Sequence, residues 1–277
     1  MSHELLKLTQ EIYSTPHLIS LEHFTKIANY LDSRNTNLVA FPKEKEDTPK
    51  KDFLDKTAKM AVIPLMGATT YRETAISAMC GLTSYEGLLR QTQEAIDAGV
   101  TKVILHTDSG GGSAQGAFAS ANEFKQLCAD AGITTYAYVD GSCCSAAYAW
   151  AAVCDVVVAE PYANVGSIGV LVAMSDTSEK DVKEGVRTVY VTDGTSKIPF
   201  DENGKFKAEY LKDVQDKVTF LGDEFRAHVS SHTGISTKTL KDTQAKVYMA
   251  SDALELGLIN KIMTKSEFIS YVVEGKV

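Results

Sequence analysis

The stretch that decides the fold runs from Tyr136 to Val170 and reads YAYVDGSCCSAAYAWAAVCDVVVAEPYANVGSIGV. Its first half passes from alternating apolar residues through a polar turn into a run of small residues, which predicts a closely packed helix. Two serines, Ser142 and Ser145, lie in that turn and in the first helical turn. Backbone N–H groups at such a place lack intrahelical partners, and the helix dipole favours negative charge nearby. A serine there is placed to attack a carbonyl group.

Apolar runs on both sides of this stretch alternate with amphipathic segments. We predict strands at 60–66, 100–105, 133–139 and 156–159, and helices at 84–98 and 114–131. Strands that alternate with helices of this length indicate parallel βαβ units in an α/β protein. Ligands of such sheets bind at the carboxyl ends of the strands, and the polar segments DSGGGS after Leu105 and DGSCCS after Val139 fall there.

The first part of the chain has a different character. We expect two short helices at 4–13 and 21–31, separated by Pro16, and a charged linker at 41–56 that contains two prolines. The predicted division is therefore a helical arm with its linker over 1–57 and a main domain over 58–277.

After Ser167 the pattern predicts a strand at 187–192 (RTVYVT), a long amphipathic helix at 207–232 and short strands at 245–248 and 258–263. The apolar stripe of the long helix consists of Leu211, Val214, Val218, Leu221, Phe225 and Val229. Such a stripe is more often core within one chain than a contact with another copy.

Composition excludes several classes of function. With 277 residues, 44% of them hydrophobic, the chain can build a substantial core, and a net charge of −8 argues against a partner held by nucleic-acid phosphates. No window approaches the apolar length of a membrane span, and the start does not resemble a signal peptide, so we expect a cytoplasmic protein without a membrane anchor. The five cysteines and six histidines show no zinc-ligand spacing, so we expect no metal and no cofactor.

The three glycines at 110–112 leave backbone N–H groups bare and permit positive φ, which suits an oxyanion or a phosphate. A tight strand-to-helix turn explains them equally well. The glycines do not form GxGxxG, because Gln115 occupies the last place, and no GK[ST] follows, so a nucleotide site is disfavoured.

The base for a serine nucleophile is not defined by a local motif. The chain has no SxxK, and no GxSxG surrounds the candidate serines. Nothing in the sequence ties His106 or His228 to them. A Ser/Lys pair needs a lysine desolvated enough to be neutral near pH 7. Lys197, followed by Ile198-Pro199-Phe200, is the best local candidate, although most lysines are solvated surface residues.

Four segments carry a resemblance: DSGGGSAQG at 108–116, the block at 136–170, VSSHTGIS at 229–236 and VYMASDALELGLINKI at 247–262. Together they resemble the signal peptide peptidase A family of Ser/Lys proteases, and more closely its bacteriophage branch of head-maturation (prohead) proteases. The similarity covers roughly residues 60–265. It implies the crotonase/Clp-protease-like ββα spiral superfold.

Carried over by position, the family nucleophile falls on Ser145, before Ala146-Ala147-Tyr148, and not on Ser142. The family base falls on Lys197, 52 positions downstream. The resemblance also implies that Ser167, in the GSIG turn, orients this lysine, unless it is a plain turn serine.

The implied oxyanion hole combines the N–H of Ala146 with one from the glycine segment. Gly111 is favoured, with Gly110 and Gly112 as neighbours, because Gly110 stands where the family has proline. The atypical pair Cys143-Cys144 indicates small-residue packing more than thiol catalysis.

The resemblance implies protein substrates, namely scaffold and capsid proteins inside an assembling phage head in the host cytoplasm, and a ring-shaped homo-oligomer. Three alternatives stay open. They are a cellular signal-peptide-peptidase-like protease, disfavoured without a membrane anchor, a crotonase-type acyl-CoA enzyme, and a non-catalytic head component that keeps the fold.

Overall fold

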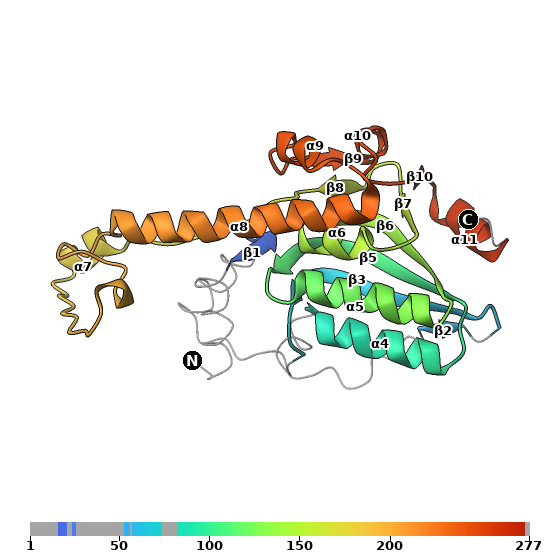
Figure 1. Cartoon of the computed structure of the whole chain (residues 1–277), viewed down its shortest axis with the longest axis horizontal. Helices are drawn as coiled ribbons and strands as arrows, with labels where there is room; N and C mark the ends of the chain where they lie inside the picture. The colour runs from blue at the N-terminus through green and yellow to red at the C-terminus, as the bar shows by residue number, and fades with distance from the viewer. Residues whose placement is uncertain (1–15, 21–23, 26–52, 56, 74–81, 275–277) are drawn as a thin grey trace.

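A computed structural model of the chain describes residues 16–20, 24–25, 53–55, 57–73 and 82–274 (Figure 1). The expected helix at 4–13 lies outside these residues, as do nearly all of the expected helix at 21–31 and of the linker at 41–56.

Four parallel strands form the centre of the sheet. They are β3 (Met60–Thr70), β5 (Lys102–Ser113), β6 (Thr134–Cys144) and β7 (Val156–Ala159). Neighbours pair in the order β7-β6-β5-β3, with β10 (Lys261–Ile262) parallel to β7 at one edge and β2 (Leu54–Asp55) antiparallel to β3 at the other. The predicted α/β class with a mainly parallel sheet is confirmed.

Two of these strands run further than predicted. The polar segments after Leu105 and Val139 are not loops, because β5 continues to Ser113 and β6 to Cys144. After a register shift, Ser109 of β5 pairs with Cys143 of β6, and the end of β6 pairs with β8 (Asn164–Gly166). Pairing with neighbouring strands satisfies the backbone there although the side chains have poor strand propensity.

Helices cover both faces of the sheet. On one face lie α4 (Tyr85–Asp97), α5 (Ala117–Asp130) and α6 (Ala146–Ala151) (Figure 1). Trp150 of α6 is fully buried, with ring centroids 5.7 Å from both Tyr85 and Phe124. On the other face, α11 (Lys265–Val273) stacks Phe268 on Tyr138 at 4.5 Å.

Strand pairing and hydrogen bonds connect the C-terminal part of the chain to the centre of the protein. It contains α9 (Thr237–Asp242), β9 (Val247–Met249) and α10 (Ala250–Glu255) before β10, and β9 pairs antiparallel with β8. The two predicted short strands are thus present. The buried Tyr148 hydroxyl of α6 donates to the carbonyl of Leu258 at 2.8 Å, and the Asn260 side chain accepts from the N–H of Val157 at 2.6 Å.

The long helix α8 (Ala208–Thr233) extends past the sheet, with α7 (Ser178–Lys183) near its far end (Figure 1). Only its C-terminal half is packed: Phe225 and Val229 are fully buried. Leu211 and Phe220 in the first half are 42% and 64% exposed.

The prediction of a strand at 187–192 is wrong. Val189 and Val191 are 73% and 96% exposed, and no strand of the described residues pairs with this segment. An alternating apolar pattern forms a strand only where a partner edge is available. The segment instead belongs to the exposed region that precedes α8 and includes the short 3-10 helix η1 (Thr195–Lys197).

Two strands of the sheet, β1 and β2, come from the segment assigned to the helical arm and its linker. β1 (His17–Ile19) pairs antiparallel with the end of β5, and Leu18 is fully buried in the core. The division of the chain near residue 57 stays a prediction.

Among the described residues, no helix combines the length and apolar composition that crossing a bilayer requires.

Candidate active site

Ser145 lies at the sharp turn from β6 into α6. Its φ of 57° and ψ of −120° are unusual for a residue with a side chain, and such strain costs about 1–3 kcal/mol. The Ser145 N–H donates to the carbonyl of Gly166 at 2.8 Å, and its Oγ donates to the carbonyl of Gly169 at 3.5 Å. The side chain is fully buried. Strain held by such contacts is typical of functional positions.

Gly111 is the glycine that lies against this serine. A Cβ atom on Gly111 would come within 2.9 Å of Ser145 Cβ and 2.9 Å of the Cys144 carbonyl oxygen. Its φ of 98° also favours glycine. Only a residue without a side chain lets the end of β5 approach the serine this closely.

The other two glycines have different contacts. The carbonyl of Gly110 accepts from the N–H of Ser20 at 2.8 Å. Gly112 lies against Thr69, whose N and Oγ1 atoms would both be 2.5 Å from an added Cβ. The N–H of Gly111 donates to Ser109 Oγ at 3.2 Å, and Ser109 Oγ itself donates to the carbonyl of Gly67 at 2.5 Å.

Ala146 and Ser167 are also close to the serine along the backbone. Ala146 is the first residue of α6 and is fully buried. Ser167 follows Gly166, the residue that accepts the Ser145 N–H, and its own N–H donates to the carbonyl of Lys246 at 3.0 Å. Ser167 has a positive φ of 54°. The pairing of β8 with β9 therefore fixes the GSIG segment beside Ser145.

Lys197 is not brought to Ser145 within one chain. It is an exposed residue of η1, a segment held at the start of α8 by Lys207, whose Nζ donates to the carbonyl of Thr195 at 3.2 Å. Ala208 precedes the buried Phe225 by 17 residues, which in an α-helix correspond to about 26 Å. The structure thus assembles four predicted site residues, Ser145, Gly111, Ala146 and Ser167, and leaves the lysine at the far end of α8.

The two histidines considered from the sequence, His106 and His228, are engaged elsewhere. His106 Nε2 lies 2.6 Å from Asp140 Oδ2, and its ring is near Tyr138, in the cluster that α11 covers. His228 Nε2 lies 2.9 Å from the carbonyl oxygen of Ala149, and burial lowers the pKa of its ring.

The thiols near the serine are buried. Burial raises the pKa of Cys143 well above its usual range, with a smaller contribution from Cys144. A thiol that holds its proton is a poor nucleophile. The packing interpretation of Cys143-Cys144 is therefore favoured. Among the described residues, no group of three His, Cys, Asp or Glu side chains is arranged to hold a metal ion.

Sequence reasoning missed one part of the site, strand β1, which lies beside the glycine segment. The available signal was the short run HLI directly after Pro16, because proline in sheets is found at the start of strands and at edges.

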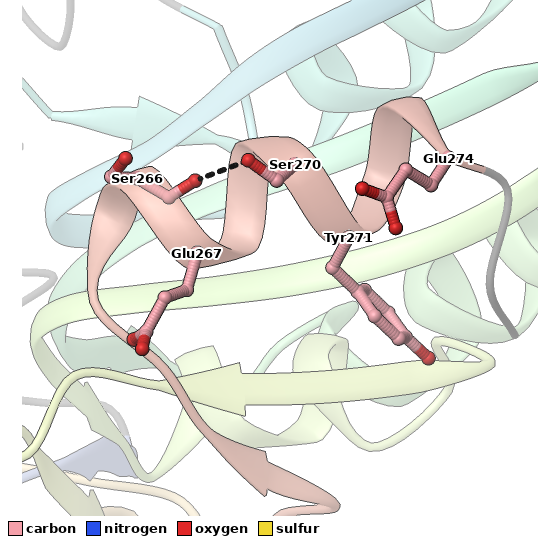
Figure 2. A pocket seen from close by; sticks show the side chains of 5 residues that line it. All are labelled: Ser266, Glu267, Ser270, Tyr271 and Glu274. Carbon is pink, nitrogen blue, oxygen red and sulfur yellow. Dashed lines mark hydrogen bonds between the residues drawn. The ribbon is translucent and has the colours of Figure 1, made fainter.

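A depression of about 280 Å³ lies elsewhere, on α11. Figure 2 shows the five residues that line it: Ser266, Glu267, Ser270 and Tyr271 of this helix and Glu274, which directly follows it. The Ser270 hydroxyl donates to the backbone carbonyl of Ser266 at 3.1 Å. The depression shares no residue with the Ser145 site.

A strained serine at a strand-to-helix turn, beside a glycine-bearing strand end in a mainly parallel sheet, is an arrangement that serine hydrolases use. Comparison with known families agrees. Residues 128–276 match Peptidase family S49, which is more than half of the chain, and the chain belongs to this family.

The curated relatives include two phage proteins. The chain is 28% identical over 212 residues to the head-tail preconnector protein GP5 of Enterobacteria phage P21, covering 76% of this chain and 42% of the relative. It is 26% identical over 212 residues to the capsid assembly protease C of Escherichia phage lambda, covering 76% of this chain and 48% of the relative. The chain thus spans less than half the length of these two relatives. Together with the family match, they confirm the resemblance to the phage branch of these proteases.

Two further matches are more distant. A putative protease of Methanocaldococcus jannaschii is 29% identical over 175 residues, covering 62% of this chain and 55% of that protein. A solved structure of a membrane-bound stomatin-specific protease mutant in complex with a substrate peptide matches with a TM-score of 0.43 and 14% identity, over 76% of this chain and 78% of that one.

Proposed function

We propose that this chain is a serine endopeptidase in which Ser145 is the nucleophile and Lys197 the general base. The observation that carries the proposal is the strained, buried Ser145 packed directly against Gly111 in a member of Peptidase family S49. Family membership favours peptide-bond cleavage over the acyl-CoA chemistry that the sequence left open.

In the proposed reaction, the amine of Lys197 takes the Ser145 proton while Oγ bonds to the peptide carbonyl carbon. The N–H groups of Gly111 and Ala146 stabilise the tetrahedral oxyanion, with about 3–4 kcal/mol for each donor. Gly111 would exchange its 3.2 Å bond to Ser109 Oγ for a stronger, charge-assisted one. The C–N bond then breaks, the lysine passes its proton to the leaving amine, and a water activated by the same lysine hydrolyses the acyl-enzyme.

In this proposal a second copy supplies Lys197. Within one chain the lysine lies at the far end of α8, in an exposed region. If that end reaches the Ser145 site of a neighbouring copy, contact with the protein there removes the ammonium from water and favours the neutral amine. Ser167, beside Ser145, would then orient the incoming lysine. A ring of copies satisfies this requirement at every site.

We further propose that the substrates are scaffold and capsid proteins of a phage head assembling in the host cytoplasm. This rests on the relatives, one of which is a capsid assembly protease. Neither a nucleic-acid partner nor a membrane anchor is part of the proposal.

The test is cleavage of the phage head proteins co-expressed with the chain, read by intact-mass spectrometry. Ser145→Ala should abolish cleavage and leave the circular dichroism spectrum and melting temperature essentially unchanged. Ser142→Ala is the matched control, because Ser142 lies three residues earlier, at the end of β6, and its N–H keeps its 2.9 Å bond to Asp108 Oδ1. Undiminished cleavage by Ser145→Ala, or loss of cleavage only in Ser142→Ala, would contradict the proposed nucleophile.

A further inference from the structure

Strand β1 is paired along the glycine segment of the site. Within β1, Leu18 is opposite Gly112 and Ile19 opposite Gly111, and the following N–H of Ser20 donates to the carbonyl of Gly110 at 2.8 Å. The end of β5 therefore presents its backbone to β1 instead of to solvent.

The opposite edge of β1 is paired as well. The N–H of His17 donates to the carbonyl of Leu171 at 2.9 Å, and the N–H of Leu171 donates back to the carbonyl of His17 at 3.0 Å. Leu171 lies two positions after the last residue of the GSIG segment. β1 is thus the middle strand between the glycine segment and the residues after the GSIG turn.

Strand β1 fills a channel whose two walls are the glycine segment at 110–112 and the residues after the GSIG turn. Both walls of this channel belong to the Ser145 site. Gly111, on one wall, packs against Ser145, and Gly169, near the other, accepts from Ser145 Oγ at 3.5 Å. A Cβ added to Gly111 would also collide with the carbonyl oxygen of Leu18. Strand β1 therefore passes directly over the place where a peptide carbonyl must lie for attack.

The channel has the chemistry of a peptide site. Backbone donors and acceptors on both walls can pair with any extended chain, whatever its sequence, and side-chain pockets then give selectivity. Leu18 is fully buried and Ile19 is 6% exposed, so the channel accepts apolar side chains at these two places.

We propose that His17–Ile19 is the resident occupant of this channel and blocks it until a substrate strand displaces it. The inference rests on the proposed function and adds to it a block of the site by the chain's own segment. The fraction of molecules with β1 released sets the apparent affinity for substrate.

The first experiment weakens the pairing of β1 without changing Ser145 or the glycine segment. His17→Pro combined with Ser20→Pro removes two N–H donors, those to Leu171 and Gly110. The matched control, His17→Ala with Ser20→Ala, keeps both N–H groups. For cleavage of a fluorogenic peptide, the kcat/KM of the proline variant should exceed that of the unsubstituted protein by at least about tenfold, mainly through a lower KM. The kcat/KM of the alanine variant should stay close to that of the unsubstituted protein.

The second experiment uses the unchanged N-terminal segment and needs no catalysis. Full-length Ser145→Ala protein is incubated with a synthetic peptide of residues 14–22 (STPHLISLE), and hydrogen exchange is followed by mass spectrometry. Saturating peptide should raise exchange at the amides of 17–20. The same peptide with Leu18→Asp should not, because it places a charge in an apolar pocket.

The outcomes separate the two proposals. Unchanged exchange at 17–20 with saturating peptide, or a folded proline variant with unchanged kcat/KM, would overturn the inference and leave Ser145 as the proposed nucleophile. Displacement of β1 by the peptide, together with undiminished head-protein cleavage by Ser145→Ala, would support the channel and contradict the proposed nucleophile. If the proline variant does not fold, the exchange experiment alone decides.

Discussion

The two halves of α8 have the same apolar periodicity and different surroundings. In the C-terminal half, Phe225 and Val229 are fully buried, and the Phe225 ring lies 5.3 Å from that of Phe118 in α5. In the N-terminal half, Leu211 continues the stripe but is 42% exposed. The comparison teaches that periodicity predicts which side of a helix is apolar, and that only tertiary structure determines what covers it.

The same division separates the proposed catalytic groups. Ser145 caps α6, the helix on which the packed half of α8 rests through His228 and Ala149. Lys197 lies beyond the exposed half, in a region held by aromatic contacts such as Phe200 with Phe206 at 4.9 Å.

The largest effect is expected at Lys197. Lys197→Ala should lower cleavage of head proteins by about 10²–10⁴-fold, because a general base is lost, with little change in melting temperature for an exposed side chain. If a second copy supplies the lysine, co-expression of Ser145→Ala with Lys197→Ala should restore activity at about a quarter of the sites in a randomly mixed ring.

Lys246→Ala is the control for loss of a lysine close to the site. The Lys246 carbonyl accepts from the GSIG segment, and Lys246 Nζ lies over the Tyr248 ring at 5.1 Å. A mixture that stays inactive although both variants co-purify in one assembly would place the base within the same chain as the serine. Loss of cleavage in Lys246→Ala alone would move the base to that residue.

The second prediction compares the two halves directly. Phe225→Ala should lower the free energy of unfolding by about 3–5 kcal/mol, because it leaves a cavity in the core. Leu211→Ala, at the exposed end of the same stripe, should change it by about 0.5 kcal/mol or less. Urea titration of both variants measures the difference. Equal effects would mean that the first half is also packed within the chain.

The smallest effect concerns pH and the packed half. Burial, with smaller contributions from His228 and Lys125, lowers the pKa of His232 to about 4. Lys125 Nζ lies 3.1 Å from His232 Nδ1, and Asn122 Oδ1 lies 2.9 Å from Nε2, so the neutral ring accepts from the lysine and donates to the amide. The unfolded chain binds this proton first, near pH 6.5, and stability should be lost as pH falls from there to about 4.

Because solvent screens the charge of this partly exposed ring, the loss in the free energy of unfolding should be about 1–2 kcal/mol. His232→Gln should remove that part of the pH dependence between pH 7 and 5 in urea titrations, while carboxylates elsewhere contribute equally to both proteins. Parallel curves for the two proteins would show that this histidine has an ordinary pKa.

Much of the fold was predictable from local pattern. The four central strands were placed correctly in the sequence, and β7 has the predicted bounds, because buried parallel strands read as continuous apolar runs. The continuation of β5 through its glycines was not predictable, since it depends on pairing with distant residues. The strand predicted at 187–192 failed for the converse reason, because its alternating residues find no partner edge in the described part of the chain.

The site divides in the same way. Ser145, Gly111 and Ala146 come from two neighbouring strand ends, which parallel topology brings together, so spacing and resemblance were sufficient to expect them in one place. Their catalytic roles stay predictions. The place of Lys197 depends on where α8 carries its exposed end, and the position of β1 depends on a pairing across more than 90 residues. Neither is encoded in a local pattern.

The hydroxyl of Tyr148, three residues after Ser145, connects the catalytic turn to a distant segment of the chain. Its partner is the carbonyl of Leu258, and Asn260 in turn receives the N–H of Val157. A version of the protein cut short before residue 258 would leave a phenol and an amide without partners in the interior, at about 1–3 kcal/mol each. The segment from Leu258 to Asn260 thus supports the helix that begins at the serine.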